Sequence, residues 1–350
     1  MKSIKYLLLM VCAGCGCLGI ILPASAQIWT QTSAPSTNWE CIASSADGSK
    51  LVALNDLYGI YASTNSGNTW QKATNGPTFS YAYWSSLASS ADGSKLVATA
   101  SYVPIGPPEG GIFISTNFGI GWAHTSAMPG LQAVACSSDG IKMAAIGGGI
   151  YVSTNSGTTW TQTSAPNAPN SNWTPIASSA DGMKLVAAFY GGGIYISTNS
   201  GATWTQTGAP STNWFSCASS ADGKKLAAVV SGGGIYTSTN SGTSWTSNSV
   251  PVTSWRGVSS SADGSRLVAV ATNGLIVTST NWGAAWLSNN VPSNHWWSVA
   301  SSADGTKLAA AFTLPIPFPS RRYALLPRIT TSPSPGRCLQ RISFCRRFQI

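Results

Sequence analysis

Charged side chains are scarce in this sequence of 350 residues: Asp, Glu, Lys and Arg make up only 8% of it, and there are only two histidines. All ten acidic residues lie between positions 27 and 312, where ten basic residues balance them. The formal net charge of +9 therefore comes from Lys2, Lys5 and seven arginines after position 320. A nucleic-acid-binding domain needs a basic surplus on its own surface. The composition predicts no nucleic-acid partner.

Paired cysteines are also lacking. Of the eight cysteines, three fall before position 20 and two after position 330. Cys41, Cys136 and Cys217 remain, an odd number with no close spacing, which argues against a disulfide framework and a metal site. We expect them to be small apolar residues in strands, and we expect no metal and no cofactor.

Helical periodicity is missing throughout, and two turn motifs alternate in its place. The first is Ala-Asp-Gly (once Ser-Asp-Gly), and the second is Ser-Thr-Asn-x-Gly, as in residues 197–201. The turn aspartates recur every 41 to 47 residues, at Asp47, Asp92, Asp139, Asp181, Asp222, Asp263 and Asp304. Asp-Gly between apolar runs is a strong hairpin signal. A period of about forty residues with two hairpins per unit indicates a β-propeller.

The repeat predicts an all-β fold of seven four-stranded antiparallel blades over residues 27–312. In one unit the expected strands are 176–179, 184–188, 194–197 and 203–207. Residues 28–32 match the fourth strand of a repeat, so this N-terminal strand is expected to close the last blade and cover its open edge. The repeat pattern stops after Phe312, so the last blade is expected to be incomplete, with its third strand absent or improvised.

Both ends of the chain differ from the repeats. Residues 1–26 have a charged start, an apolar run over 6–22 and the small-residue site Ala24-Ser25-Ala26, which predicts a signal peptide cleaved after Ala26. The protein is then secreted or in the cell envelope, with no membrane span; a retained membrane anchor is the alternative. Residues 313–350 form a basic tail with seven Arg and no acid. This tail indicates a frameshift or a truncated gene, or else a natural disordered segment.

The second turn motif, read as Ser-x-Asn-x-Gly-x-Thr-Trp, resembles the Asp-box (BNR) repeat, whose family pattern has Asp in place of Asn. Such repeats occur in sialidases, xyloglucan-cleaving glycosidases, sortilin-type receptors and photosystem II assembly factors. The replacing asparagines are Asn65, Asn117, Asn155, Asn199, Asn240 and Asn281. Asn keeps a turn-forming side-chain bond without the charge. The resemblance implies the fold and does not imply an activity.

The resemblance also raises the alternative of a glycoside hydrolase, which needs two carboxylates about 5–9 Å apart. Outside the turn aspartates only three acids remain: Glu40, Asp56 and Glu109. In the expected topology all three lie on the face formed by the second-to-third-strand turns and the linkers. A sialidase is disfavoured, because only Arg256 and Arg266 are available to hold a substrate carboxylate.

Tryptophan marks the most suggestive candidate site. A Trp stands eight residues before six of the seven turn aspartates: Trp39, Trp84, Trp173, Trp214, Trp255 and Trp296. A ring of indoles beside Ser, Asn and Pro suits stacking on sugars or peptides. The alternative is that these indoles are core residues between blades. Phe215, Arg256, His295 and Trp297 adjoin this ring, differ between repeats and could set specificity.

The expected function is a non-catalytic binding or scaffold module for an extracellular glycan or protein, acting as a monomer. A glycoside hydrolase using Glu40, Asp56 or Glu109 is the alternative. A degraded gene copy without present function is a third possibility.

Overall fold

The computed structural model describes residues 8–9, 29–35, 37–55, 59–74, 83–102, 110–126, 128, 130–166 and 173–313. Every regular element in this part of the chain is a β-strand. No helix that could cross a membrane occurs in these ranges. The fold class is therefore all-β, as expected.

Between residues 41 and 288 the strands are grouped in fours, and within each group successive strands pair antiparallel in chain order. The first three groups are β3 (Cys41–Ser44), β4 (Leu51–Asn55), β5 (Gly59–Ser63), β6 (Gln71–Lys72); β7 (Tyr83–Ser89), β8 (Leu96–Tyr102), β9 (Gly111–Ser115), β10 (Ala123–Ser126); and β11 (Ala133–Cys136), β12 (Met143–Ile146), β13 (Ile150–Ser153), β14 (Thr161–Gln162). The next three are β15 (Trp173–Ser178), β16 (Leu185–Gly192), β17 (Ile194–Ser197), β18 (Thr205–Gln206); β19 (Thr212–Ser219), β20 (Leu226–Gly233), β21 (Ile235–Ser238), β22 (Thr246–Ser247); and β23 (Thr253–Ser260), β24 (Leu267–Ala271), β25 (Ile276–Ser279), β26 (Leu287–Ser288). The three groups from β15 to β26 are also joined to one another, into one sheet of twelve strands.

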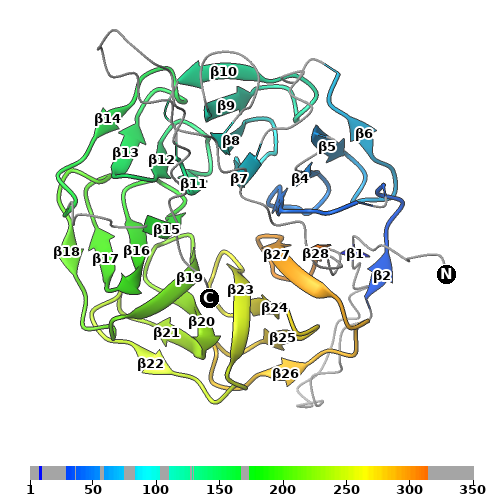
Figure 1. The fold of residues 1–350 in the computed structure, drawn as a ribbon. Helices are drawn as coiled ribbons and strands as arrows, with labels where there is room; N and C mark the ends of the chain where they lie inside the picture. The colour runs from blue at the N-terminus through cyan, green and yellow to red at the C-terminus, as the bar shows by residue number, and fades with distance from the viewer. Residues whose placement is uncertain are drawn as a thin grey trace, which may run out of the picture. The chain divides into compact units, whose positions relative to one another are not determined.

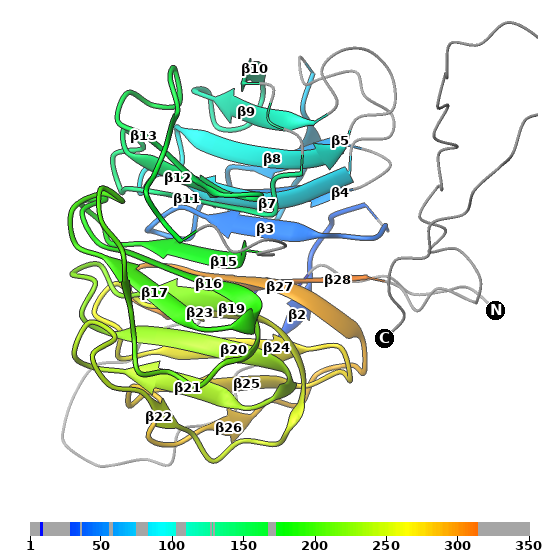
Figure 2. The same cartoon turned by 60° about the vertical axis from the view of Figure 1, so that its left-hand side comes forward.

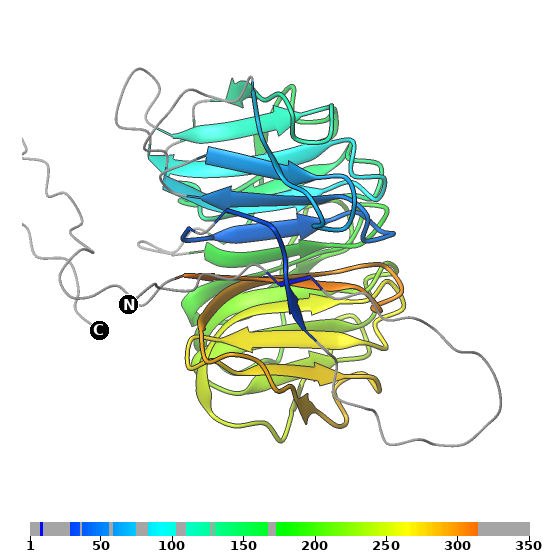
Figure 3. The same ribbon diagram turned by 90° about the vertical axis from the view of Figure 1, so that its right-hand side faces the viewer.

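Within residues 29–313 the sheets are arranged around a common centre (Figure 1). The first strand of each sheet is innermost and the fourth is outermost. Figures 2 and 3 show the same sheets from the side, as successive layers of strands. The second strand β16 is longer than the expected 184–188, because its end pairs with the next sheet through Tyr190 and Asn213. Ser231 and Ser254 make the same connection between β20 and β23.

The last sheet combines both ends of the described chain, in the order β2-β1-β28-β27. Strands β27 (His295–Ser301) and β28 (Leu308–Thr313) are its inner pair, and β2 (Thr30–Gln31) is its outer strand (Figure 1). The N-terminal strand thus joins the last sheet, as expected. The third position is held by β1 (Leu8–Leu9), which comes from the predicted signal peptide. The expected tail beyond residue 313 lies outside the described residues.

The Asp-Gly turns are held by a hydroxyl–carboxylate network. In one turn, Asp222 Oδ1 accepts hydrogen bonds from Ser220 Oγ at 2.6 Å and from the Lys224 N–H at 2.9 Å. Ser220 Oγ in turn accepts the Lys225 N–H at 3.0 Å. Gly223 has a φ of 66°, which a residue without Cβ adopts at little cost. The network explains why Ser, Asp and Gly recur together.

The Ser-Thr-Asn-x-Gly turns use a different network. Ser197 Oγ accepts the Gly201 N–H, and Asn199 Oδ1 accepts the Thr203 N–H, both at 2.9 Å. The turn-forming bond of the asparagine therefore reaches the backbone four residues on. Asn199 Nδ2 also donates to Thr203 Oγ1 at 2.9 Å, a contact that a carboxylate could make only as acceptor. Ser200, with a φ of 55°, shares the left-handed conformation with Gly201.

Seven backbone hydrogen bonds join successive Asp-Gly turns into a closed circle, which we call the turn ring. Each is 2.6 to 2.8 Å long, and the pairs, donor first, are Ala46–Ala91, Ala91–Ser138, Ser138–Ala180, Ala180–Ala221, Ala221–Ala262, Ala262–Ala303 and Ala303–Ala46. The last bond joins the two ends of the repeat array.

Four lysines in the described residues reinforce the turn ring by donating to an aspartate carbonyl of the next turn: Lys50, Lys184, Lys225 and Lys307. Lys184 Nζ donates to the Asp222 carbonyl at 2.8 Å, and the lysine stem lies where a Cβ on Gly223 would be, 2.7 Å from its Cδ. Lys307 Nζ likewise donates to the Asp47 carbonyl, and the Lys307 stem lies where a Cβ on Gly48 would be. These contacts join the last turn of the array to the first. The glycines are therefore required both for their φ and for this close approach.

Cys41, Cys136 and Cys217 lie in β3, β11 and β19, which confirms their expected place in strands. Burial raises the pKa of the Cys136 thiol to about 12. Burial raises the pKa of the Cys217 thiol as well, so Cys136 and Cys217 are held in the neutral form, the less reactive one.

Substituting a turn glycine should weaken the fold. Gly182 has a φ of 67°, and an added Cβ would lie 2.7 Å from Lys142 Cβ. We expect Gly182→Ala to lower the free energy of unfolding by about 1–2 kcal/mol or more. Gly208→Ala is the control, since an added Cβ there meets nothing within 4 Å; it should change stability by less than about 0.5 kcal/mol. Urea unfolding of both variants measures the difference, and equal stabilities would contradict the prediction.

Acid should weaken the turn ring. Hydrogen bonds from Ser261, and then from Ser265, lower the pKa of Asp263 to about 2. An unfolded Asp titrates near about 3.9, so this stabilisation is complete above that pH and is lost as the pH falls from about 4 to about 2. The pKa is lowered by the same kind of bond at Asp47, Asp92, Asp139, Asp181, Asp222 and Asp304.

The variant Asp263→Asn isolates one of these groups, because it keeps an acceptor oxygen and does not titrate. Its stability should fall less steeply than that of the wild type between pH 4 and pH 2. Urea midpoints measured across this range give the two slopes. Equal slopes would show that the carboxylate of Asp263 contributes nothing to the acid sensitivity.

Candidate functional site

The six tryptophans at the start of the inner strands are core residues in this structure. Their exposed fractions lie between 0% and 6% for Trp39, Trp84, Trp173, Trp214, Trp255 and Trp296. Leu131, the exception in the third repeat, is also buried, at 1%. Trp214 packs edge-on against Tyr236, with ring centroids 5.1 Å apart. This burial corresponds to the alternative in which the indoles fill the space between sheets.

A β-bulge follows the tryptophan in several inner strands. In β19 the partner of Trp214 is Val230 and the partner of Ser216 is Val229, so Phe215 is the extra residue. The register shifts at the equivalent place in β23 and in β27, where Arg256 and Trp297 are the extra residues. A bulge re-aims the side chain of its extra residue. In these strands the residue after the buried tryptophan is therefore the one whose side chain is re-aimed.

Phe215, Arg256 and Trp297 form one cluster. The Arg256 guanidinium carbon lies 4.3 Å from the centroid of the Phe215 ring and 4.9 Å from that of the Trp297 ring. The two rings are 6.0 Å apart and nearly perpendicular. Strand β23 separates β19 from β27 in the circle (Figure 1), so these side chains meet on the side of the common centre. All three are half-buried.

Stacked contacts between a guanidinium and aromatic rings contribute about 0.5–2 kcal/mol, more when water is excluded. The cluster therefore offers two aromatic rings and a cation at one place. Such a combination can hold an aromatic, sugar or carboxylate group of a ligand.

The same repeat position is occupied differently around the circle. We call this set the inner ring: Glu40, Ser85, Gln132, Thr174, Phe215, Arg256 and Trp297. Two of its small polar members serve the neighbouring strand. Ser85 Oγ donates to the Leu131 carbonyl at 2.9 Å, and Thr174 Oγ1 donates to the Trp214 carbonyl at 2.8 Å. The three inner-ring positions held by the cluster have no such short hydroxyl and present larger side chains instead.

The other predicted site residues are distributed as follows. Glu40, half-buried, is in the inner ring. Asp56 and Glu109 lie outside the described residues, so the expected pair of carboxylates is not tested. His295 is exposed at the start of β27, one residue before Trp296. The sequence named Phe215, Arg256, His295 and Trp297 together as residues beside the tryptophans that could set specificity; it did not show that Phe215, Arg256 and Trp297 contact one another.

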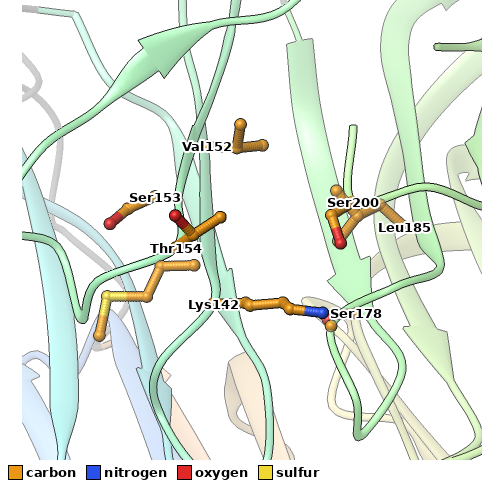
Figure 4. A pocket seen from close by; sticks show the side chains of 9 residues that line it. Lys142, Val152, Ser153, Thr154, Ser178, Leu185 and Ser200 are labelled. Carbon is orange, nitrogen blue, oxygen red and sulfur yellow. The ribbon is translucent and has the colours of Figure 1, made fainter. Parts of the chain in front are cut away.

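The small cavities among the described residues lie between neighbouring groups of strands. One lies between the third and fourth groups of strands, with Lys142, Val152, Ser153, Leu185 and Ser200 in its wall (Figure 4). Its volume of about 10 Å³ is near the space that a single water requires. A second crevice has the same volume and the equivalent residues one repeat further on. The repetition indicates packing between sheets and not a ligand pocket.

Comparison with solved structures defines the class of fold. The chain is similar to YCF48 from Cyanidioschyzon merolae, with a TM-score of 0.59 and 15% identity, covering 82% of this chain and 99% of that chain. A structure described as YCF48 bound to D1 peptide gives a TM-score of 0.58 at 14% identity, covering 83% and 97%. The β-propeller domain of Cps50 (Swd1) from Myceliophteria thermophila gives 0.57 at 13% identity, covering 80% and 98%.

The fold is therefore a β-propeller. At these identities the likeness shows the fold alone. No protein-family model matches the sequence, and no curated protein matches it.

A buried tryptophan should tolerate an aromatic replacement. Trp214 is fully buried, and its Nε1 has no hydrogen-bond partner among the described residues. We expect Trp214→Phe to cost less than about 1.5 kcal/mol and Trp214→Ala to cost about 3–5 kcal/mol of unfolding free energy, as for other core truncations. Thermal unfolding of both variants tests this. A Trp214→Ala protein as stable as the wild type would show that this indole does not stabilise the core.

Proposed function

We propose that the chain is a secreted, seven-bladed Asp-box propeller that binds a segment of an extracellular protein or a glycan and catalyses no reaction. The observation that carries the binding function is the cluster of Phe215, Arg256 and Trp297 on three successive inner strands. Residues of this type dominate the energies of binding surfaces. Their convergence at a bulge, beside a centre surrounded by all the sheets, suits a contact site.

The count of seven blades is supported by the turn ring, whose seven bonds lead from Ala46 back to Ala46. The Asp-box assignment is supported by the repeated hydroxyl and amide contacts of the Ser-Thr-Asn-x-Gly turns. The predicted signal peptide supports export, and no second copy is needed to complete the cluster, which agrees with a monomer.

A protein segment is the first ligand class to test. One propeller of similar fold, YCF48, has been observed with a bound peptide. A glycan is the second class, since stacked aromatic rings also recognise sugars. The hydrolase alternative has one described carboxylate in the inner ring, Glu40, and a glycosidase requires two.

The processed protein should be screened against peptide and glycan arrays and against a panel of glycosidase substrates. We expect saturable binding without turnover. Substituting Trp297→Ala or Arg256→Ala should lower the affinity about tenfold or more, because each removes a stacked group from the cluster.

Trp282→Ala is the matched control. Trp282 is 47% exposed and lies in a Ser-Thr-Asn-x-Gly turn, a different repeat position from that of the cluster. Lys225 Nζ lies 3.4 Å from the centroid of its ring. The control should keep full affinity. Equal losses in Trp282→Ala and Trp297→Ala would contradict the proposed site. Turnover that disappears in Glu40→Gln, Asp56→Asn or Glu109→Gln would contradict the non-catalytic function.

A further inference from the structure

The third strands of six sheets share one pattern of side chains. The first of four residues is always isoleucine, with an exposed fraction of 0% to 3%: Ile60, Ile112, Ile150, Ile194, Ile235 and Ile276. The fourth is always serine, with an exposed fraction of 1% to 3%: Ser63, Ser115, Ser153, Ser197, Ser238 and Ser279. The fold therefore has a buried place for isoleucine and a buried place for serine in each third strand.

The last sheet keeps the same register on its second strand. In the fifth group, Ser216 pairs with Val229, and third-strand Ile235 pairs with Val229 on the other side. In the last sheet, Ser298 pairs with Ala311. Ala311 is thus the residue opposite which an isoleucine belongs. In the fifth group, Leu226 of the second strand pairs with Ser238 of the third. Leu308 has the equivalent position in the last sheet, so a serine belongs opposite it.

Strand β1 occupies only the middle of this position. Leu8 pairs with Ala310 and Leu9 with Ala309. On the outer side the same two residues pair with Gln31 and Thr30 of β2. Among the described residues, no third-strand residue stands opposite Ala311 or Leu308. The isoleucine and serine places of this sheet are therefore outside the two-residue pairing of β1.

The walls of this position are uncharged. All six residues of β28 are buried, including Phe312 at 1%, and Trp296 lies beside them in the same core cluster. Neither β28 nor β2 contains a charged residue. An occupant that matches these walls is an uncharged, extended segment.

We propose that the third-strand position of the last sheet, between β28 and β2, binds an extended segment of a partner protein. The segment has a branched apolar residue opposite Ala311 and a small hydroxyl residue opposite Leu308. Removal of the leader at Ala26, as the sequence predicts, takes β1 away and exposes the edges of β28 and β2. Strand addition uses main-chain hydrogen bonds for affinity and alternate side-chain places for specificity. This site is separate from the inner ring.

A peptide with the sequence of residues 191–201, GGGIYISTNSG, is a probe with the required pattern. It should bind the secreted, processed protein, whose N-terminus is established by mass spectrometry. The full-length chain should bind it at least tenfold more weakly, because β1 competes. Introducing Leu8→Asp and Leu9→Asp into the full-length chain should restore the binding, because two charges do not fit the uncharged walls.

Two control peptides separate strand pairing from non-specific adhesion. One carries backbone N-methyl groups at the second and third strand residues, which removes the pairing donors and leaves the side chains unchanged. The other replaces the first strand residue, Ile194→Asp. Each should bind at least tenfold more weakly. Equal binding of the control peptides would overturn the proposal.

A benzophenone in place of the peptide's Tyr195 identifies the contact. Attachment to residues 308–311 or 30–31 supports the proposal. It is overturned by attachment elsewhere, by the lack of saturable binding to processed protein that melts cooperatively, or by protection data that place residues 314–350 in this position. Variants of Arg256 and Trp297 should leave the binding of this peptide unchanged.

Discussion

The rest of the structure depends on the backbone hydrogen bond between neighbouring Asp-Gly turns. Each turn can donate to the next only because a serine–aspartate network and a left-handed glycine give it one fixed shape. The bond from Ala303 to Ala46 makes the circle complete. With both ends of the array joined, every sheet has two neighbours at this level. The positions of the inner strands, and of the side chains they direct toward the centre, follow from this closure.

That closure explains why a single repeat position becomes a site. Residues 82 positions apart, Phe215 and Trp297, contact the same guanidinium because their strands stand on either side of β23. Where the inner ring has serine or threonine, its hydroxyl ties neighbouring strands together. The serine that follows the inner-ring residue also links neighbouring strands, beside small and large side chains alike: Ser86 Oγ accepts the Val134 N–H, Ser216 Oγ accepts the Val258 N–H, and Ser298 Oγ accepts the Ile42 N–H. The scaffold can therefore vary these positions without losing the links between strands.

The sequence predicted the local elements well, because turns and strand alternation are local properties. The third strand over 194–197 coincides with β17, and the turn residues match. It could not predict the longer β16, since the end of that strand is held by a neighbouring sheet. It also could not decide between core and surface for the tryptophans, because an amphipathic indole suits both. The contact of Arg256 with two rings, and the pairing of Leu8 with Ala310, required the closed circle.

The asparagines of the outer turns, which are the Ser-Thr-Asn-x-Gly turns between the third and fourth strands, affect how the fold responds to acid. In the Asp-Gly turns, which join the first and second strands of a sheet, each aspartate is a titrating group, and its hydrogen bonds weaken when protonation removes the charge. In the outer turns the same acceptor role belongs to an amide oxygen, as in Asn199, and amides do not titrate over this range. The outer edge of the molecule therefore keeps its turn geometry under conditions that loosen the centre. Loss of structure in acid is expected to proceed outward from the Asp-Gly turns, a direction set by the replacement of one side-chain oxygen by nitrogen.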